Sequence, residues 1–479
     1  MPFLIATLIL IYTSTAAAYQ DRPIINDYSE LETNERSEFH SDKECKPNDT
    51  ACKVNRKVHR IEKTIEGEAD QYETGEVWDK LQVPEEHHGK TKYGLRALKL
   101  AAQTPDYLLR GVTWPLAVSA KYLIKKGVVE DMVNFFSNDA RTFWVYPLIE
   151  IGFGDSLGLG IGIRHTDLFH KNYKFSLKHQ IHINLDQSSN IKFGKPDAVM
   201  INGRPLSYEI STKWRRYYAG NYYGMGIGTP QSDHSIFGID TIRWGGEVKY
   251  NLISHLNIAG NLYANNDMSK NGEDGYPNVA TTFPLSELPG FKKFIFYLTP
   301  GIRLEYDNRN HTAAPSKGGH HFFKFKRFQG LNRTDFDFNE YEVQALQFFE
   351  LWNNRHVLAL RMNWKFRHET NGSQIPFYRE TSLDVYSPIR GFSSGRFHDR
   401  IRSVYNVEYR FKVWSFVDGQ LFFDTGRVYH NAKDISFKKF KYAGGVGLRL
   451  RTNNYFLLRT QVAYGGEGVK FLVKTSQAF

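Results

Sequence analysis

Charged residues of both signs gather with glycines in the twelve-residue segment between Ile389 and Arg400. Their chemistry is ion pairing, because one guanidinium can offer two parallel N–H donors to a single carboxylate. The glycines let the backbone turn tightly, so such a segment can fold back on a neighbouring surface. The candidate functional residues of the segment are Arg390, Gly391, Phe392, Gly395, Arg396, Asp399 and Arg400.

Few patterns typical of catalytic or metal sites occur in the sequence. No phosphate-binding glycine loop followed by Lys-Ser or Lys-Thr is found. Histidine pairs lack an accompanying carboxylate or cysteine pattern and are interpreted as polar loop residues: His87 with His88, and His320 with His321 near His311. Asp233-His234 is a common dipeptide. The sequence therefore predicts no enzyme, no bound metal and no cofactor.

Composition narrows the class of protein that must position these residues. The chain has 479 residues, a net charge of +11 and 15% aromatic residues, and its mean hydropathy is −0.49. No uncharged apolar run of eighteen residues occurs, which excludes membrane-spanning helices. Arginine and lysine alternate along strand-like segments instead of clustering beside stacking aromatics, which disfavours nucleic-acid binding. Low hydropathy with many aromatic residues is typical of outer-membrane β-barrels.

From Thr142 onward, apolar and polar side chains alternate with a period of two. Between Phe456 and Tyr464, for example, Arg459 and Gln461 share one face, whereas the other face is apolar. Such alternation separates lipid-facing from lumen-facing positions. At roughly twenty residues for a strand plus half a hairpin, residues 142–479 give about sixteen strands. The sequence therefore predicts an all-β fold, a sixteen-stranded antiparallel transmembrane β-barrel with both ends on the periplasmic side.

The segment before the barrel has a different character. Residues 1–18 contain an apolar run followed by small residues and predict a secretory signal peptide cleaved after Ala18, although no Lys or Arg precedes Arg22. Residues 19–141 predict a polar, partly disordered and partly helical periplasmic leader. Its Cys45 and Cys52 predict a small disulfide-closed loop, with two free thiols as the alternative. A metal site at this pair would lack its other ligands.

Four motifs, taken together, resemble those of the bacterial surface antigen superfamily. This family comprises the sixteen-stranded BamA/TamA-like barrels for outer-membrane assembly and secretion. The motifs are residues 389–400, Phe422–Val428, Tyr442–Arg449, and Leu304–Arg309 followed by Pro315 and Gly318. The resemblance spans about residues 142–479, and the final aromatic, Phe479, is similar to the sorting signal of such barrels. No pattern for the periplasmic POTRA modules of assembly factors is found in residues 19–141, which indicates the barrel-only branch.

The resemblance implies a role for the charged segment. In this family the segment lies in an extracellular loop that folds into the lumen, and its arginine, here Arg390, pairs with the aspartate of the strand motif, here Asp424. Three glycines of the wall, Gly426, Gly445 and Gly447, would leave room for the loop, and Gly426 belongs to the predicted lock. The remaining family-motif residues are Asp307, Arg309, Pro315, Gly318, Gly445, Gly447 and Arg449.

Two functions follow as hypotheses. The first is insertion or translocation of protein or lipid at the bacterial outer membrane, with gating by the Arg390 loop and by the seam between the first and last strands. Its expected partners are outer-membrane lipid, including lipopolysaccharide, and a periplasmic partner or client protein. The second is a porin-like or structural barrel whose basic lumen favours anions. In either case the barrel is expected to be monomeric.

Overall fold

The computed structural model describes most of the predicted barrel and little of what precedes it. The described residues are 114, 131, 134–152, 158–273, 275–312, 314–351, 356–383, 389–414, 417–451 and 456–474. The predicted signal peptide, the predicted disulfide between Cys45 and Cys52, and the terminal Phe479 lie outside them. Of the predicted leader, only the few residues just before the first strand are described.

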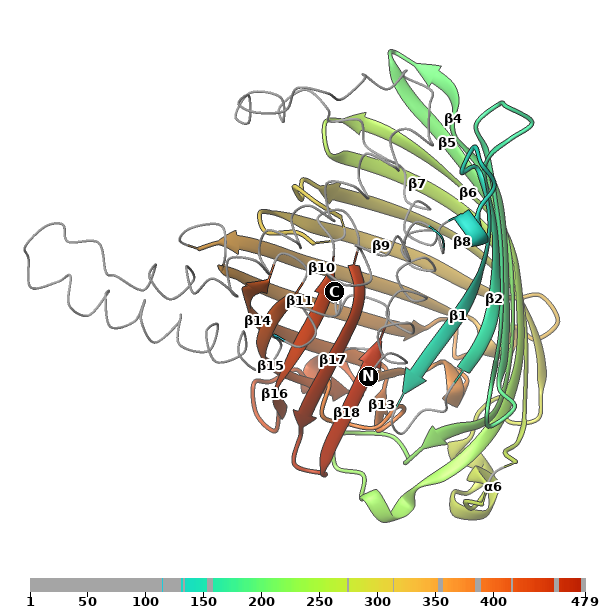
Figure 1. The fold of residues 1–479 in the computed structure, drawn as a ribbon. Coiled ribbons are helices and arrows are strands. Elements are labelled where there is room, and N and C mark those ends of the chain that lie inside the picture. The colour runs from blue at the N-terminus through green and yellow to red at the C-terminus, as the bar shows by residue number, and fades with distance from the viewer. Residues whose placement is uncertain are drawn as a thin grey trace, which may run out of the picture.

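Sixteen antiparallel strands form one closed barrel in which neighbours along the chain are neighbours in the ring. The wall strands are β1 (Phe143–Gly152), β2 (Gly158–Leu168), β3 (Tyr173–His182), β4 (Gln187–Ile201), β5 (Arg204–Tyr222), β6 (Ser235–Ile253), β7 (Leu256–Asn271), β8 (Phe294–Asp307), β9 (Gly318–Gly330), β10 (Phe338–Glu350), β11 (His356–Glu369), β14 (Ile401–Trp414), β15 (Val417–Tyr429), β16 (Lys441–Arg451), β17 (Phe456–Tyr464) and β18 (Val469–Lys474). The predicted fold class and strand number are confirmed (Figure 1).

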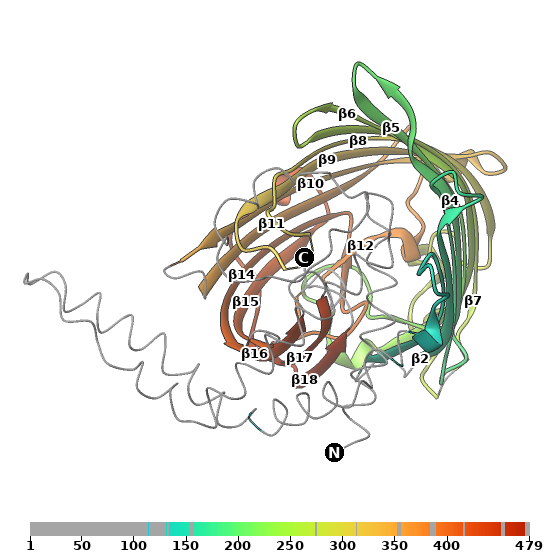
Figure 2. The same cartoon turned by 45° about the horizontal axis from the view of Figure 1, so that its top comes forward.

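The loop between β11 and β14 carries a small sheet of its own. Strand β12 (Thr381–Leu383) pairs antiparallel with β13 (Phe397–Asp399), and this pair is separate from the barrel sheet. Figure 2 looks into the ring of wall strands and shows β12 inside it. We refer to residues 370–400, of which 384–388 are not described, as the inner loop. The inner loop therefore occupies the barrel interior.

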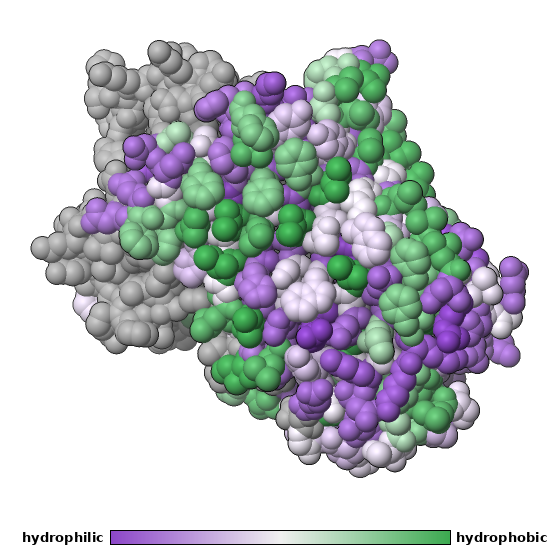
Figure 3. All heavy atoms as spheres, turned by 90° about the vertical axis from the view of Figure 1, so that its right-hand side faces the viewer, coloured by the Kyte–Doolittle hydropathy of each residue, from purple (hydrophilic) through white to green (hydrophobic). Residues whose placement is uncertain are grey.

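The faces of the wall strands follow the alternation seen in the sequence. On β17, Val462 and Tyr464 are exposed, whereas Arg459 and Gln461 are buried toward the lumen. The exposed positions form the outer surface that faces lipid, and the buried ones meet the inner loop and each other. Figure 3 shows apolar side chains spread over one such outer face, with the most polar ones densest at its lower right. The predicted separation of apolar and charged faces is confirmed.

Helices are short in the described part of the chain. The 3-10 helices are η1 (Gln231–Asp233), η2 (Leu285–Glu287), η3 (Thr334–Phe336), η5 (Phe377–Arg379) and η6 (Ala432–Asp434), and the single-turn α-helix is α6 (Val279–Thr282). No helix among the described residues is long and apolar enough to span a membrane.

Candidate functional site

The inner loop is positioned by strands on both of its sides. It leaves β11 at Glu369, runs through η5 and β12, returns through β13, and enters β14 at Ile401. The register of its small sheet places Thr381 opposite Asp399, and the Thr381 hydroxyl donates to the Asp399 carbonyl oxygen at 2.6 Å. The small sheet therefore joins the two described limbs of the inner loop, residues 370–383 and 389–400, independently of their contacts with the wall.

Arg390 lies at the centre of a buried ion-pair network. Its Nε donates to Asp424 Oδ2 and its Nη2 to Asp424 Oδ1, both at 2.7 Å. Its Nη1 donates to Glu408 Oε2, also at 2.7 Å, and its backbone N–H donates to Asp424 Oδ2 at 3.1 Å. The side chains of Arg390, Asp424 and Glu408 are 1%, 0% and 1% exposed. The structure thus brings Arg390 and Asp424 together and adds a second carboxylate that the sequence analysis missed.

Neighbouring wall residues hold the two carboxylates in place. Asn406 lies directly opposite Asp424 in the register of β14 and β15, and its Nδ2 donates to Asp424 Oδ1 at 2.8 Å. Glu408 accepts from Arg410 Nε at 2.7 Å. The Arg390 guanidinium carbon lies 3.5 Å from the centroid of the Phe422 ring, a cation–π contact. Two cations and two carboxylates therefore balance in charge, and an aromatic face covers the arginine.

The inner loop approaches the wall so closely that side chains would not fit at several glycines. A Cβ at Gly391 would lie 2.5 Å from the backbone nitrogen of Gly465, in the turn between β17 and β18. A Cβ at Gly426 would lie 2.7 Å from Ile389 Cδ1, a residue of the inner loop. At Gly445 and Gly447 the nearest atoms belong to wall residues instead, among them the Phe422 ring at 2.4 Å from a Gly445 Cβ. The last two glycines therefore make room for wall side chains, not directly for the loop.

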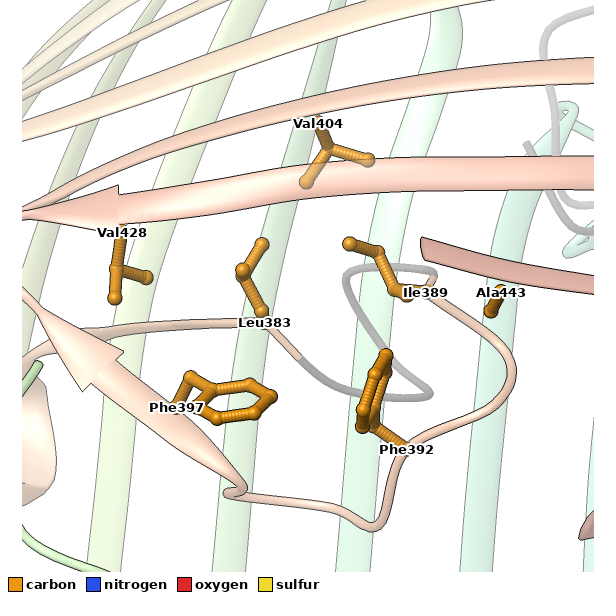
Figure 4. Packing of buried hydrophobic residues seen from close by; sticks show 7 residues of the cluster. All are labelled: Leu383, Ile389, Phe392, Phe397, Val404, Val428 and Ala443. Atoms are coloured by element: carbon orange, nitrogen blue, oxygen red, sulfur yellow. The ribbon is translucent and has the colours of Figure 1, made fainter. Parts of the chain in front are cut away.

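An apolar cluster packs the inner loop against β14, β15 and β16. Its buried members are Leu383, Ile389, Phe392, Phe397, Val404, Val428 and Ala443. Figure 4 shows Leu383, Ile389 and Phe392 pointing toward the wall strands, whereas the Phe397 ring extends along the loop toward Phe392. Ile389 of this cluster adjoins Arg390 in the chain, and the ion-paired side chains are almost completely buried; burial strengthens their electrostatic contacts.

Arg396 attaches the inner loop to two other loops. Its Nε donates to both carboxylate oxygens of Glu467, at 3.0 and 2.8 Å, in the turn between β17 and β18. Its Nη1 and Nη2 donate to the Thr229 hydroxyl and carbonyl oxygens at 2.9 and 2.8 Å. Gly395 has φ +66°, and a Cβ there would lie 2.3 Å from the Asn221 carbonyl oxygen. Only glycine fits this turn, which aims Arg396 at both partners.

A third attachment, Arg379 with Asp267, was not found from the sequence. Arg379 Nε and Nη2 donate to Asp267 Oδ2 and Oδ1 at 2.6 and 2.7 Å, and the aspartate is fully buried on β7. The guanidinium carbon lies 5.3 Å from the centroid of the Phe328 ring. Asp267 alternates onto the lumen face of its strand, but its partner is 112 residues away. Nothing in the local pattern could have paired them.

The remaining residues of the predicted loop motif have peripheral positions. Arg400 Nη2 donates to Glu369 Oε1 at 2.6 Å, and both side chains are about a quarter exposed. Asp399 is buried; it accepts from the Arg400 backbone N–H and lies 3.1 Å from His430 Nδ1. Neither Arg400 nor Asp399 touches the Arg390 network through any described contact. Arg449, a residue of the Tyr442–Arg449 motif on β16, has its Nη1 3.8 Å from Asp418 Oδ2 on β15.

The Leu304–Arg309 motif forms a separate site, where β8 turns into β9. Arg309 Nε and Nη2 donate to Asp307 at 2.8 and 2.6 Å. Gly318 has φ +82°, and the Pro315 carbonyl oxygen lies 3.5 Å from Arg410 Nη1. This turn therefore contacts Arg410, which is linked to Arg390 through Glu408.

The interpretation of the later histidine pair as loop residues without a carboxylate is wrong. His320 and His321 lie in β9, and His320 Nε2 is 2.6 Å from Glu305 Oε1 on β8. The strand begins with Gly318 and Gly319, and because glycine has no side chain, the apolar–polar alternation is not visible there. No group of three or more His, Cys, Asp or Glu side chains among the described residues is placed to hold a metal ion.

The comparisons with known proteins agree with this architecture. A family model described as the Omp85 superfamily domain matches residues 167–478. Among solved structures, the chain resembles BamA from Haemophilus ducreyi lacking POTRA domains 1-3, with a TM-score of 0.54 and 13% identity over 70% of each chain. CdiB from Acinetobacter baumannii gives a TM-score of 0.44 and 14% identity over 69% of this chain and 59% of the other. A comparison with curated proteins gives no match.

Proposed function

Because the chain belongs to the Omp85 superfamily of outer-membrane barrels, we propose that it inserts or translocates protein segments or lipid at the bacterial outer membrane. In this proposal the inner loop is a conformational lock and no residue of it is catalytic. The observation that carries the proposal is Arg390, which is buried inside the barrel and held by Asp424 and Glu408. A barrel that served only as a scaffold would not need a buried charge network between a loop and its wall.

The contacts of the inner loop connect this lock to the last strand. Gly391 packs on Gly465, and Ser393 accepts from the β18 residue Lys470, whose Nζ lies 2.9 Å from the Ser393 hydroxyl. Strand β18 in turn closes the barrel against β1. A shift of the loop would therefore act directly on one side of the closing seam.

In this proposal the seam between β1 and β18 is the place where the barrel opens. Within the described residues, β1 and β18 pair at two positions, Ile151 with Val473 and Gly152 with Leu472. These pairs join the first wall strand to the last. We infer that a client or lipid enters the membrane there.

The predicted terminal features remain part of the proposal. Residues 1–18 are a signal peptide, residues 19–141 are a periplasmic leader with a Cys45–Cys52 disulfide, and Phe479 completes the sorting signal. A periplasmic partner presents the client. Mass spectrometry of the mature, non-reduced protein tests both the cleavage after Ala18 and the disulfide.

The proposal is tested by depleting the protein in its native cell and measuring the other outer-membrane proteins and the surface lipid. We expect a specific loss of at least one of them, restored by the wild-type chain but not by Arg390→Gln. Crosslinking in native membranes then identifies the client. If all outer-membrane proteins and surface lipids are unchanged after depletion, the proposal is wrong.

A second candidate function is a porin-like barrel that favours anions. It is supported by lumen-facing cations of β5 and β6, such as Lys213 and Arg243, which lie opposite each other in the register. Planar-bilayer recordings separate the two candidates. Steady, large and anion-selective conductance supports the porin, whereas low or flickering conductance supports a gated barrel.

A further inference from the structure

Two cations face each other on the lumen side of neighbouring strands. Lys213 on β5 lies directly opposite Arg243 on β6. The adjacent Trp244 and the nearby Ile210 are exposed on the outer face, so alternation directs Lys213 and Arg243 inward. Directly opposed side chains have Cβ atoms about 5 Å apart, and like charges at that distance repel each other.

The nearest pair of carboxylates along these strands has its own counterions. Glu209 and Glu247 also lie opposite each other, four residues from the cation pair. Glu209 accepts from Lys192 Nζ at 3.0 and 3.2 Å, and Glu247 accepts from Arg303 Nη2 at 2.7 Å. The acidic pair is therefore neutralised by strands on either side, and it has no need of the two cations.

The cation pair has no such compensation. On the neighbouring strands, Asn190 lies opposite Lys213 and Asn265 lies opposite Arg243, so both flanks are uncharged. Arg215, two residues beyond Lys213, adds a third cation to the same face. No carboxylate of the described residues forms an ion pair with any of these three, and the buried Arg243 Nε has no hydrogen-bond partner among them.

A cavity in the lumen lies next to the acidic pair and is connected to Arg243 through Tyr263, although the three cations do not themselves line it. The cavity, of about 510 Å³, is lined by side chains of β3 to β9, including Glu209, Glu247 and Tyr263. The Tyr263 ring also lies under Arg243, with its centroid 4.6 Å from the guanidinium carbon. The cation–π contact holds the guanidinium over the Tyr263 ring, so Arg243 is separated from this cavity by one side chain.

We propose that Lys213, Arg215 and Arg243 bind a phosphate group inside the lumen. A phosphate carries up to two negative charges and several acceptor oxygens, so one group can satisfy three cations. Low-dielectric walls lined by one sign of charge concentrate the opposite ion, which strengthens the site. The phosphate belongs either to a small soluble anion or to the headgroup of an anionic lipid. The site lies away from the Arg390 network and is independent of it.

The first test uses the full chain, purified in an uncharged detergent, with pyrophosphate as the probe in titration calorimetry. We expect saturable binding by the wild type, weakened about tenfold or more in the double variant Lys213→Gln/Arg243→Gln. The matched control is Lys324→Gln, which removes a lumen-facing lysine that is paired with Glu342; it should bind like the wild type. Heat-dependent mobility on gels checks that each variant is folded, and Arg215→Gln replaces the double variant if that one does not fold.

The second test distinguishes the two sources of phosphate. Native mass spectrometry from nanodiscs compares retention of phosphatidylglycerol with that of phosphatidylcholine. Retention of phosphatidylglycerol that Arg243→Gln abolishes and pyrophosphate displaces supports a lipid headgroup, whereas pyrophosphate binding without lipid retention supports a soluble anion. If neither ligand binds the wild type, or if binding is unchanged in the variants, the proposal is overturned. Because these readouts use isolated protein, they do not depend on whether the barrel moves clients.

Discussion

At the scale of single residues, Arg390 illustrates why a buried charge can be kept. All of its guanidinium nitrogens donate to carboxylates, and those carboxylates have further donors in Asn406 and Arg410. Burying a charge costs free energy unless its partners satisfy it fully. The network meets this condition, so its value lies less in stability than in allowing one position of the loop.

Replacing Arg390 by glutamine should release the loop. The change leaves Asp424 buried without a counterion, at a cost of about 3–5 kcal/mol, whereas Glu408 keeps its ion pair with Arg410. We expect faster amide hydrogen exchange in residues 389–400, with the barrel still folded. The control is Arg400→Gln, whose ion pair with Glu369 is partly exposed and should cost at most about 1 kcal/mol. Equal protection in both variants would contradict the lock.

A second residue of the loop, Glu380, predicts a dependence on pH. Burial raises the pKa of its carboxyl from 4.5 to about 8, and its Oε2 has no hydrogen-bond partner among the described residues. Asp399 and Glu369 add to the rise, whereas Arg367 and Arg400 oppose it. The folded protein therefore keeps a proton at neutral pH that the unfolded chain has lost.

The sign of the effect follows from this proton. The contribution of Glu380 to stability is greatest below pH 4.5, where its carboxyl is protonated in both states, and it falls by up to about 1.4 kcal/mol per pH unit until about pH 8. Glu380→Gln cannot ionise, so it should remove this slope and exceed the wild type in thermal stability at pH 8 more than at pH 5. Unfolding followed by circular dichroism over this range measures it. A parallel pH dependence in both proteins would refute the assignment.

At the scale of elements, the inner loop is held at several points around the ring. Arg379 attaches it to β7, Arg390 to β14 and β15, and Arg396 to the turn between β17 and β18. The first limb also packs apolar side chains, such as Phe377 and Ile375, against β6 and β8. The loop therefore spans the lumen between distant strands, and its release at one point need not free it at the others.

A close backbone approach of the inner loop, at Gly391, gives a steric prediction. In Gly391→Ala, the new methyl would lie 2.5 Å from the Gly465 nitrogen and 2.8 Å from Ala443 Cβ, so the loop must move off the β17–β18 turn. We expect increased protease cleavage within residues 389–400. Gly228→Ala is the control, because no atom lies within 4 Å of its added Cβ. Unchanged cleavage of the Gly391 variant would show that the turn yields instead of the loop.

At the scale of the whole molecule, closure of the barrel rests on the seam between β1 and β18. Registered positions such as Gly152 and Leu472 lie opposite each other across it. The last strand also carries the contact of Lys470 with the inner loop. The seam and the lock are therefore one mechanical unit in the proposed function.

A disulfide across the seam should stop that function. Opposed residues of antiparallel strands have Cα atoms about 4.5–5.5 Å apart, within the range of a disulfide. In a background without Cys45 and Cys52, Gly152→Cys/Leu472→Cys should abolish complementation under oxidising conditions and recover it on reduction. The control is Val462→Cys/Phe471→Cys, which links β17 to β18 away from the seam. Full complementation with the seam closed would exclude lateral opening.

Much of the fold was predictable because barrel alternation is a local property of the chain. Whether Val462 faces lipid and Arg459 the lumen depends only on the parity of neighbouring residues, so the sequence predicted the wall, its strand number and its faces. The strand motif around Asp424 and the glycines beside Arg390 also indicated, through resemblance, which two charges would meet.

Other parts of the site were decided by tertiary structure alone. The second carboxylate at Glu408, the pair of Arg379 with Asp267, and the contact of Arg396 with Glu467 join residues far apart in the chain. The uncompensated pair of Lys213 and Arg243 likewise depends on strand register. Alternation fixes the face on which a side chain lies. The path of a loop across the lumen and the register between strands fix which side chain it meets, and these follow from packing of the closed barrel as a whole.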